Sequence, residues 1–284
     1  MTAKQPRNPT VDPALLERLG NVRAVLLDMD GVVYRGRQPL PGVQEMLDYL
    51  ERTGRRWLFV TNNATKTPEM FVQTLAQMGI QAAPGHILSS ALATASWLAD
   101  EYPARGRVQV VGMSGLILAL LDQGFTLAAD PFQADFVVAA ADFDLTFRKV
   151  ADATLAIRNG ARFVGTNIDA SWPSEQGELP GAGSILALLE TASGVAPTVI
   201  GKPFPGMFQQ AMRMLGVGPE ETLMVGDRYE TDIVGAIKLG ILTAGVLTGV
   251  TSEEGFRQAD PPPDLILPGL PALLALFQAA DQGR

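Results

Sequence analysis

The chain has 284 residues, of which 47% are hydrophobic and 18% charged, and its formal net charge is −8. These proportions are typical of a globular protein, and without a Lys/Arg cluster neither nucleic acid nor an anionic membrane is an expected partner. The chain contains no cysteine, which excludes disulfides, thiolate catalysis and cysteine-ligated zinc. The single histidine, His86, excludes most histidine-based hydrolases and is expected to be a packing or surface residue.

The N-terminal segment, residues 1–20, is polar and carries no apolar signal core. No apolar run in the sequence approaches the ~20 residues that a membrane-spanning helix needs. We therefore expect a cytoplasmic protein that does not interact with membranes.

Short apolar runs alternate with amphipathic segments, beginning with a predicted buried strand in residues 22–30 (VRAVLLDMD). A helix is predicted in residues 41–54, because apolar residues recur at helical spacing from Val43 to Leu50 and Gly54 can end the helix. Residues 55–65 contain a second strand, and residues 67–80 a second helix with Thr67 as its N-cap. This β-α-β-α order predicts a parallel sheet.

The same alternation continues toward the C-terminus. Further strands are predicted within residues 107–115, 134–142, 161–167, 197–203, 222–240, 242–249 and 264–280. Further helices are predicted within residues 116–124, 147–160, 180–194, 206–216, 222–240 and 264–280. The whole chain is therefore expected to be α/β, without internal repeats.

Four polar loops follow predicted strands: DMDG (residues 28–31), TNNAT (61–65), GKP (201–203) and GDRYETD (226–232). In an open α/β sheet, ligands bind at the carboxyl ends of the strands, so these loops are expected to meet in one crevice. A lone GKP or TNN is most often a turn or a helix cap, but the four loops together indicate a site.

The residue types in these loops suit a phosphate group. Aspartate pairs without nitrogen or sulfur ligands favour Mg²⁺ over zinc. Lys202 adds a positive charge, and Thr61 with the amides that follow it can bind an anion. A carboxylate that attacks a phosphate dianion needs such positive charge to offset repulsion, and the attack gives an aspartyl-phosphate.

Asp28 and Asp30 are spaced as this mechanism requires. One carboxylate attacks, and a second protonates the leaving alcohol and then activates water. The i, i+2 spacing puts both side chains on one side of an extended chain. Gly31 permits a tight turn that approaches the phosphate closely.

In this order, DMDGVVYRG, TNNAT, GKP and GDRYETDI resemble the haloacid dehalogenase superfamily of aspartate-nucleophile phosphatases. The match is closer to the NagD-like, 4-nitrophenylphosphatase-like branch with a type IIA cap, which residues 166–190 also resemble. The resemblance spans residues 21–276. It implies a doubly wound parallel core, built from residues 1–86 and 198–284, with an inserted α/β cap at residues 87–197.

Carried over position by position, the resemblance implies catalytic roles for three residues. Asp28 is expected to be the nucleophile and a Mg²⁺ ligand. Asp30 is expected to be the general acid/base, with its backbone carbonyl as a further ligand. Lys202 is expected to screen the charges of the nucleophile and the phosphate.

The resemblance also implies binding roles. Thr61 and Asn62 are expected to hold the phosphate, with Asn63 nearby. Asp227 is expected to ligate Mg²⁺, and Asp232 to act through water or to orient the site.

The cap is expected to close over the site, exclude water and select the substrate. Asp142, Asn167 and Asp169 are its candidates for substrate contact, although such residues after strands are also common in turns. Ile168 stands where this branch more often has proline, a departure that bears on the shape of the loop.

The expected function is Mg²⁺-dependent hydrolysis of phosphate monoesters of small metabolites. Two alternatives stay open: a phosphotransferase or mutase that passes the phosphoryl group to another alcohol, and a non-catalytic protein that binds phosphometabolites. Asp30 argues against the second, because a binding protein needs no acid there. A homodimer formed through the cap, and the roles of Arg228 and Tyr229, are also left open.

Overall fold

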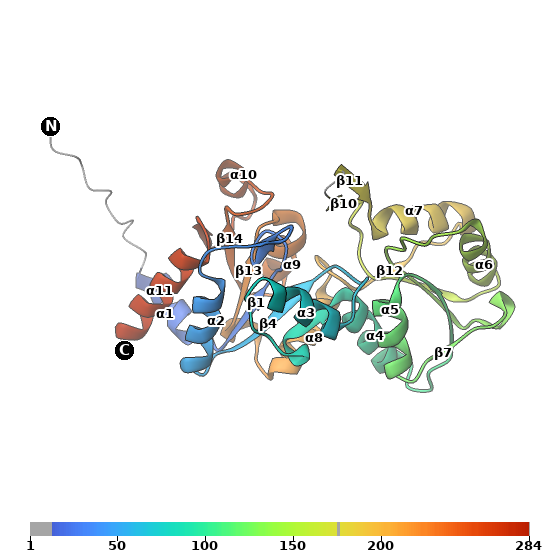
Figure 1. Cartoon of the computed structure of the whole chain (residues 1–284), viewed down its shortest axis with the longest axis horizontal. Coiled ribbons are helices and arrows are strands. Elements are labelled where there is room, and N and C mark those ends of the chain that lie inside the picture. The colour runs from blue at the N-terminus through green and yellow to red at the C-terminus, as the bar shows by residue number, and fades with distance from the viewer. Residues whose placement is uncertain (1–12, 175–176, 284) are drawn as a thin grey trace.

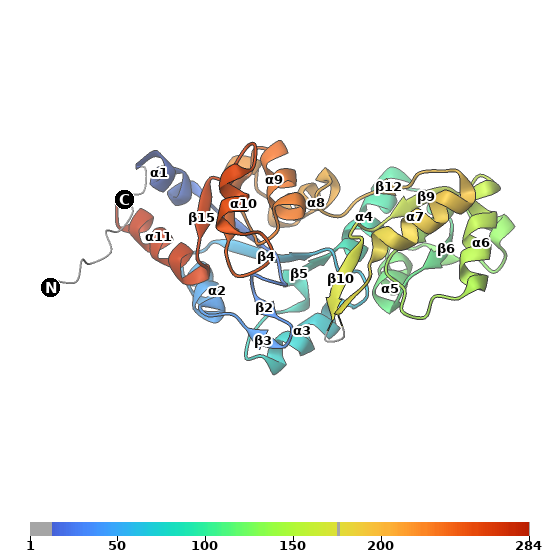
Figure 2. The same ribbon diagram turned by 90° about the horizontal axis from the view of Figure 1, so that it is seen from above.

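Two parallel β-sheets, one in each half of an elongated molecule, organise the computed structural model, which describes residues 13–174 and 177–283 (Figures 1 and 2). Both ends of the described chain lie in one half, and the middle of the chain forms the other. This arrangement confirms the predicted α/β class, with a core made by the two ends and a cap inserted between them. Within the described ranges, no helix is long and apolar enough to cross a bilayer.

The core sheet has six strands, and every pair of neighbours in it is parallel. In spatial order they are β15 (Leu265–Leu267), β14 (Leu242–Val246), β13 (Thr222–Gly226), β1 (Ala24–Leu27), β4 (Arg56–Thr61) and β5 (Ile87–Ser89). All four residues of β1 are buried, as a strand covered on both faces requires. The chain departs from the central strand β1 in both directions, which makes the sheet doubly wound.

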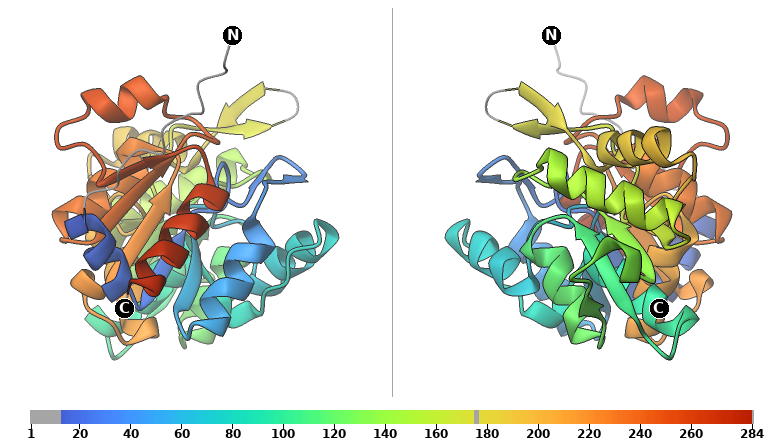
Figure 3. Two further views of the ribbon diagram at one scale, coloured as in Figure 1. Left: turned by 90° about the vertical axis from the view of Figure 1, so that its left-hand side faces the viewer. Right: turned by 90° about the vertical axis from the view of Figure 1, so that its right-hand side faces the viewer.

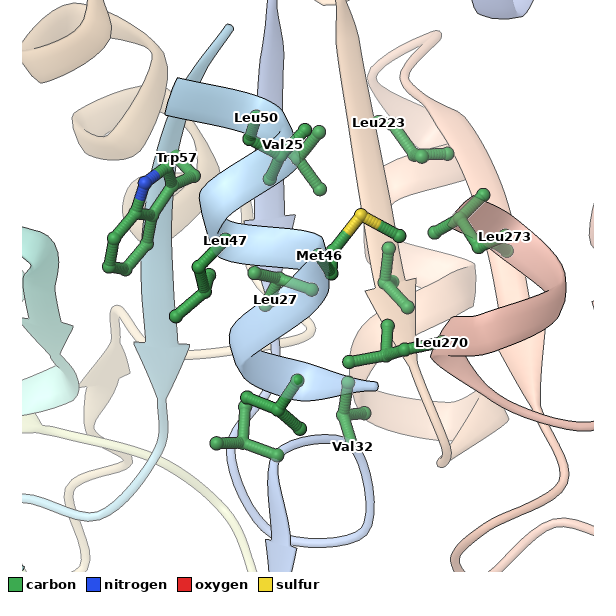
Figure 4. Close-up of a cluster of buried hydrophobic side chains, with 14 of the residues drawn as sticks. Val25, Leu27, Val32, Met46, Leu47, Leu50, Trp57, Leu223, Leu270 and Leu273 are labelled. Carbon is green, nitrogen blue, oxygen red and sulfur yellow. The ribbon is translucent and has the colours of Figure 1, made fainter. Parts of the chain in front are cut away.

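Helices cover both faces of the core sheet. One face carries α1 (Pro13–Asn21), α2 (Val43–Arg52), α3 (Pro68–Gln77) and α11 (Leu270–Gln282), whose apolar residues form the first hydrophobic cluster. Figure 4 shows Met46 and Leu47 of α2 beside Leu27 of β1 in this cluster, with Leu273 of α11 nearby. The opposite face carries α4 (Ser90–Glu101), α8 (Pro205–Leu215) and α9 (Val234–Lys238).

The local signals predicted for α2 and α3 are confirmed. Helix α2 buries its predicted apolar face, and Gly54 follows its end with a φ of 72°. Thr67 caps α3, because its side chain accepts a hydrogen bond from the backbone N–H of Met70. His86 lies just before β5 with its ring 3.9 Å from that of Trp57, so it is a packing residue as expected.

The cap sheet has five strands, all parallel, in the order β12 (Thr198–Val199), β9 (Arg162–Gly165), β8 (Phe136–Ala139), β6 (Arg107–Val111) and β7 (Thr126–Leu127). Helices α6 (Phe147–Arg158) and α7 (Ala182–Ser193) pack on one face of it. Helix α5 (Ser114–Asp122) packs on the other. An antiparallel hairpin, β10 (Ser171–Ser174) with β11 (Gly177–Pro180), stands out beyond the cap helices (Figure 3).

A second hydrophobic cluster runs without interruption from the core into the cap. It contains Leu26 of β1 and Phe208 of α8 in the core, Leu98 of α4, and Val138 of β8 in the cap. Helix α4 therefore lies between the two sheets and contributes to the packing of both.

The strand pairing bears on the domain boundaries, which were expected at residues 87 and 197. Strand β5 pairs with β4 in the core sheet, and β12 pairs with β9 in the cap sheet. A two- or three-residue apolar run does not reveal which of two parallel sheets it will join. We therefore propose that the cap comprises residues 90–199.

Short elements complete the fold. The hairpin β2 (Tyr34–Arg35) with β3 (Gln38–Pro39) follows the first polar loop, and helix α10 (Glu253–Gln258) follows β14. Three 3₁₀ turns cover Pro84–His86, Pro131–Gln133 and Pro219–Glu221, and a π-helical turn covers Tyr229–Ile233.

Candidate active site

Asp28 is the first residue after β1, at the carboxyl end of the central core strand. Its Oδ1 lies 2.5 Å from Nζ of Lys202. Burial raises the pKa of the Asp28 carboxyl well above its usual range, Lys202 opposes that rise, and Asp232 and Asp227 add to it. The carboxylate form therefore depends on positive charge nearby.

Lys202 supplies such a charge from the loop between β12 and α8. Its side chain is 2% exposed, and its Nζ also lies 2.7 Å from Oδ1 of Asp232. Burial lowers the pKa of Lys202, but attraction to Asp232 and Asp28 outweighs burial and the pKa rises. The ammonium group therefore stays charged and bridges the two carboxylates.

Asp227 and Asp232 follow β13, on the strand next to β1. The π-helical turn brings Asp232 back to the strand end, where its Oδ2 accepts a hydrogen bond from the backbone N–H of Arg228 at 3.1 Å. A Cβ at Gly226 would overlap Asp232, so this close return requires glycine. Burial, with repulsion from Asp232, raises the pKa of Asp227 to about 6.

The carboxylates of Asp28, Asp227 and Asp232 form a cluster in which one oxygen of each lies within 4.8 Å of the others. A single ammonium group, that of Lys202, pairs with two of them. Clustered oxygen donors with excess negative charge fit a hard divalent cation such as Mg²⁺. The residues present therefore fit the predicted metal, and the predicted contribution of the Asp30 carbonyl stays a prediction.

A fifth loop, after β14, holds Asp227 in place. The Oδ2 of Asp227 accepts a hydrogen bond of 2.7 Å from the backbone N–H of Val250. A Cβ at Gly249 would overlap this carboxylate, and one at Gly31 would lie 2.6 Å from its Oδ2. The sequence analysis did not single out this loop, although it follows a strand as the other four loops do.

Asp30 is exposed at the mouth of the site, separated from Asp28 by the buried Met29. The surrounding loops desolvate its carboxyl enough to raise the pKa, while the charges of Arg228 and Arg35 oppose the rise. A raised pKa favours the protonated form, which a general acid needs.

Thr61 and Asn63 shape the loop after β4. The Oγ1 of Thr61 accepts a hydrogen bond from the backbone N–H of Asn63 at 3.2 Å, so its proton can be donated to an anion. The Oδ1 of Asn63 accepts hydrogen bonds from the backbone N–H and the hydroxyl of Thr65, at 2.9 and 2.7 Å. These contacts give the Asn63 side chain a turn-forming role, and its predicted proximity to phosphate stays a prediction.

The side chain of Asn62 bonds to other parts of the protein, and its predicted phosphate contact stays a prediction. Its Oδ1 accepts a hydrogen bond from the backbone N–H of Lys202 at 2.9 Å. Its Nδ2 donates to the carbonyl of Lys202 at 2.9 Å and to Oδ2 of Asp169 at 3.1 Å. The side-chain amide is thus occupied within the protein.

Asn167 and Asp169 bring the cap to the core. The Nδ2 of Asn167 donates to the carbonyl of Asn62 at 2.8 Å, and its Oδ1 accepts from the backbone N–H of Asp169 at 3.1 Å. Ile168 between them is 46% exposed. Burial raises the pKa of Asp169, which the hydrogen bond from Asn62 and the charge of Lys202 oppose. Of these two candidates, Asp169 is the one whose charge interacts with Lys202.

Asp142 lies within the cap and both of its oxygens have partners there. Oδ1 accepts a hydrogen bond from the backbone N–H of Asp144 at 2.9 Å, and Oδ2 pairs with Nζ of Lys149 at 2.8 Å. The carboxylate itself is fully buried. These contacts favour a structural role for Asp142 over the predicted substrate contact.

Sequence comparisons place this site in a known context. A family model described as haloacid dehalogenase-like hydrolase matches residues 25–126, and a second model, of HAD-hydrolase-like proteins, matches residues 199–273. The acid sugar phosphatase of Staphylococcus aureus is 42% identical over 241 residues, which cover 85% of this chain and 92% of that protein.

Solved structures of related proteins superpose on this chain. NagD from Escherichia coli superposes with a TM-score of 0.82 at 29% identity, covering 88% of this chain and 97% of that one. A glycerol phosphate phosphatase from Mycobacterium tuberculosis, solved in complex with magnesium, superposes with a TM-score of 0.84 at 35% identity, covering 90% of this chain and 77% of that one.

Proposed function

We propose that this chain, which belongs to the haloacid dehalogenase-like hydrolases and is a phosphatase of their NagD-like branch, hydrolyses phosphate monoesters of small polyhydroxy metabolites such as sugar and glycerol phosphates. The reaction proceeds through an aspartyl-phosphate and requires Mg²⁺. The observation that carries the proposal is the pairing of Asp28 with Lys202 beside a cluster of carboxylates. The substrate class rests on the names of the S. aureus and M. tuberculosis relatives.

In the first step, an oxygen of Asp28 attacks phosphorus and the bond between phosphorus and the ester oxygen breaks. Lys202, in contact with Asp28, reduces the repulsion between this carboxylate and the phosphate dianion. The hydroxyl of Thr61 can donate to a phosphate oxygen because its own acceptor contact is already made by Asn63.

Asp30 handles the protons. Its raised pKa lets the carboxylic acid give a proton to the leaving alkoxide. The resulting carboxylate then takes a proton from a water molecule that attacks phosphorus. The bond between phosphorus and Asp28 breaks, which releases inorganic phosphate and restores both aspartates.

Asp28, Asp227 and Asp232 are the side chains placed to hold Mg²⁺, either directly or through water. When bound, Mg²⁺ would offset negative charge on the phosphate during transfer. Gly31 and Gly249 leave the space that the Asp227 carboxylate occupies.

The first experiment measures phosphate release from glycerol phosphate, sugar phosphates and 4-nitrophenyl phosphate, each with Mg²⁺ and with EDTA. We expect Mg²⁺-dependent turnover, with phosphate set free in the absence of any acceptor alcohol. Turnover that appears only when an acceptor alcohol is added would support a phosphotransferase instead. Ligand binding without turnover on any of these esters would contradict the proposal.

The Asp30→Asn variant tests the covalent intermediate. Since 4-nitrophenolate leaves without needing a proton, the first step should proceed and the second should stall. We expect a burst of about one nitrophenolate per active site, the kinetic sign of a covalent intermediate. A slow linear release without a burst, in a variant that keeps the wild-type unfolding temperature, would count against it.

A further inference from the structure

The side-chain amide of Asn62 pairs with both backbone polar groups of Lys202. It accepts from the N–H and donates to the C=O, each at 2.9 Å. The two residues are 140 positions apart: Asn62 follows β4 of the core sheet, and Lys202 lies between β12 of the cap sheet and α8. Two simultaneous hydrogen bonds fix the orientation of this backbone unit, which a single bond would leave free to rotate.

We propose that Asn62 is a positioning residue that holds Lys202 between Asp28 and Asp232 and links this lysine to the cap. The inference deepens the proposed function and rests on it where activity is the readout. The Asn62 side chain acts through Lys202, and the phosphate contact expected of this residue from the sequence stays a separate prediction.

Lys202 gains from such support because a lysine side chain is long and flexible, so a fixed backbone reduces the number of positions that Nζ can adopt. Its Nζ must stay within hydrogen-bond distance of Asp28 and Asp232 at once, 2.5 and 2.7 Å away. The residue also lies where the chain returns from β12 in the cap to α8 in the core. Its backbone would therefore follow any movement of the cap unless the core holds it.

Asn62 contacts both segments that connect core and cap. Lys202 belongs to the returning segment, and Ser90 opens α4 on the outgoing one. The hydroxyl of Ser90 donates to the carbonyl of Asn62 at 2.6 Å, and Asn167 of the cap donates to the same carbonyl at 2.8 Å. Asn62 thus contacts the outgoing segment at Ser90, the returning segment at Lys202 and the cap loop at Asn167.

The cap reaches the amide as well as the carbonyl of Asn62. The second hydrogen of Nδ2 is donated to Oδ2 of Asp169 at 3.1 Å. The packing around this junction leaves no spare room, since a Cβ at Gly201 would lie 2.8 Å from Oδ1 of Asn62 and would overlap the carbonyl of Thr166. A docked cap loop therefore supports the same amide that orients Lys202.

A double-mutant cycle tests the link to Lys202. In the wild-type background, Asn62→Ala should lower kcat by about 10²-fold with little change in KM, the scale expected for a catalytic group misplaced by about 1 Å. In a Lys202→Arg background, the same substitution should lower kcat by less than about fivefold, because its target is already gone. Losses that multiply in the double variant would overturn the inference.

Asn62→Asp is the second variant, of nearly the same size as asparagine. It keeps an acceptor for the N–H of Lys202 but turns a carboxylate toward the Lys202 carbonyl and Asp169, so kcat should fall as in Asn62→Ala. The control is Asn159→Ala, which removes an asparagine hydrogen bond inside the cap, to the carbonyl of Phe132, and should leave kcat unchanged. A fully active Asn62→Asp would contradict the proposal.

Asp169 tests the cap connection. Asp169→Asn keeps an acceptor for Nδ2 of Asn62 and should retain most of the kcat that Asp169→Ala loses. Equal kcat values for the two variants would overturn the link to the cap.

A crystal structure of Asn62→Ala separates this inference from the proposed function, because it needs no turnover. We expect Nζ of Lys202 to leave hydrogen-bond distance of Asp28 or Asp232. If Nζ of Lys202 still contacts both aspartates in the variant, the inference is overturned, whether or not the enzyme is active. If the wild-type protein is inactive but Lys202 is displaced in the structure of Asn62→Ala, the proposed function is contradicted and the inference about Asn62 stands.

Discussion

At the carboxyl ends of their strands, both sheets carry aspartates that pair with a lysine, but the balance of charge differs between core and cap. In the core, one oxygen each of Asp28, Asp227 and Asp232 lies within 4.8 Å of the others, and one lysine, Lys202, pairs with Asp28 and Asp232. In the cap, Asp142 has its own lysine, Lys149, and a backbone N–H as well. An aspartate after a parallel strand is thus only a candidate, and unbalanced charge around it is what distinguishes a reactive site.

The most severe test of this comparison is Asp28→Asn. We expect turnover of any phosphate ester to fall by at least about 10⁴-fold, because the nucleophile is lost. The unfolding temperature should stay the same or rise, since burial and two nearby carboxylates disfavour a charge at this position. Phosphate-release assays measure the expected loss of turnover, and thermal unfolding measures the expected change in unfolding temperature. A variant with more than a tenth of wild-type activity would refute Asp28 as the nucleophile.

Lys202→Met should show the largest loss of stability. It leaves Asp28 and Asp232 buried without their shared partner, and breaking a buried pair in this way costs about 3–5 kcal/mol. Urea unfolding measures the change in the free energy of unfolding. The matched cap variant, Lys149→Met, leaves one carboxylate without its lysine instead of two, and Asp142 keeps the N–H of Asp144 as a donor, so the loss should be smaller. Equal losses would remove the contrast between core and cap.

Gly249→Ala probes the loop that holds Asp227. The added Cβ would displace the Asp227 carboxylate, so the Mg²⁺ concentration for half-maximal activity should rise by about 10- to 100-fold. Titration of activity with Mg²⁺ measures it. Gly85→Ala serves as the control, because a Cβ there meets nothing within 4 Å. An unchanged Mg²⁺ requirement in Gly249→Ala would argue against Asp227 as a ligand.

The smallest effect is expected for Asp142→Asn. Asparagine can still accept from the N–H of Asp144, and the lost ion pair involves a lysine at the surface. The free energy of unfolding should drop by about 1 kcal/mol, with kcat/KM within about threefold of wild type on every ester. A substrate-dependent loss of kcat/KM would restore Asp142 to the substrate-binding set.

The sequence could predict that most of the core candidates lie together, because this information is local. Asp28, Thr61 and Asp227 each stand at the end of a core-sheet strand or directly after it, so topology brings them to one edge. Lys202 instead follows β12 of the cap sheet and meets Asp28 where the chain returns to the core. Hydrogen-bond partners are not local. The amide of Asn62 binds residues 107 and 140 positions away, and nothing in TNNAT distinguishes that use from a phosphate contact.

The same reasoning explains the other differences. Asn63 and Asp142 have partners within seven residues, but whether a polar side chain bonds its own turn or a ligand depends on rotamers that a residue pattern does not specify. The strand Ile87–Ser89 joined the core sheet because of its neighbour β4, which a three-residue apolar run cannot reveal.

The hydrophobic cluster that α4 shares between the two sheets has a consequence for how such chains can diversify. Because Leu98 of α4 belongs to the same cluster as Phe208 in the core and Val138 in the cap, the inserted segment is not an independent cassette. Excising it would expose an apolar surface on the remaining half, and grafting a different one would require a matching surface on α8. Sequence changes in single cap loops, such as the one around Asp169, are therefore easier to accommodate than replacement of the whole insertion.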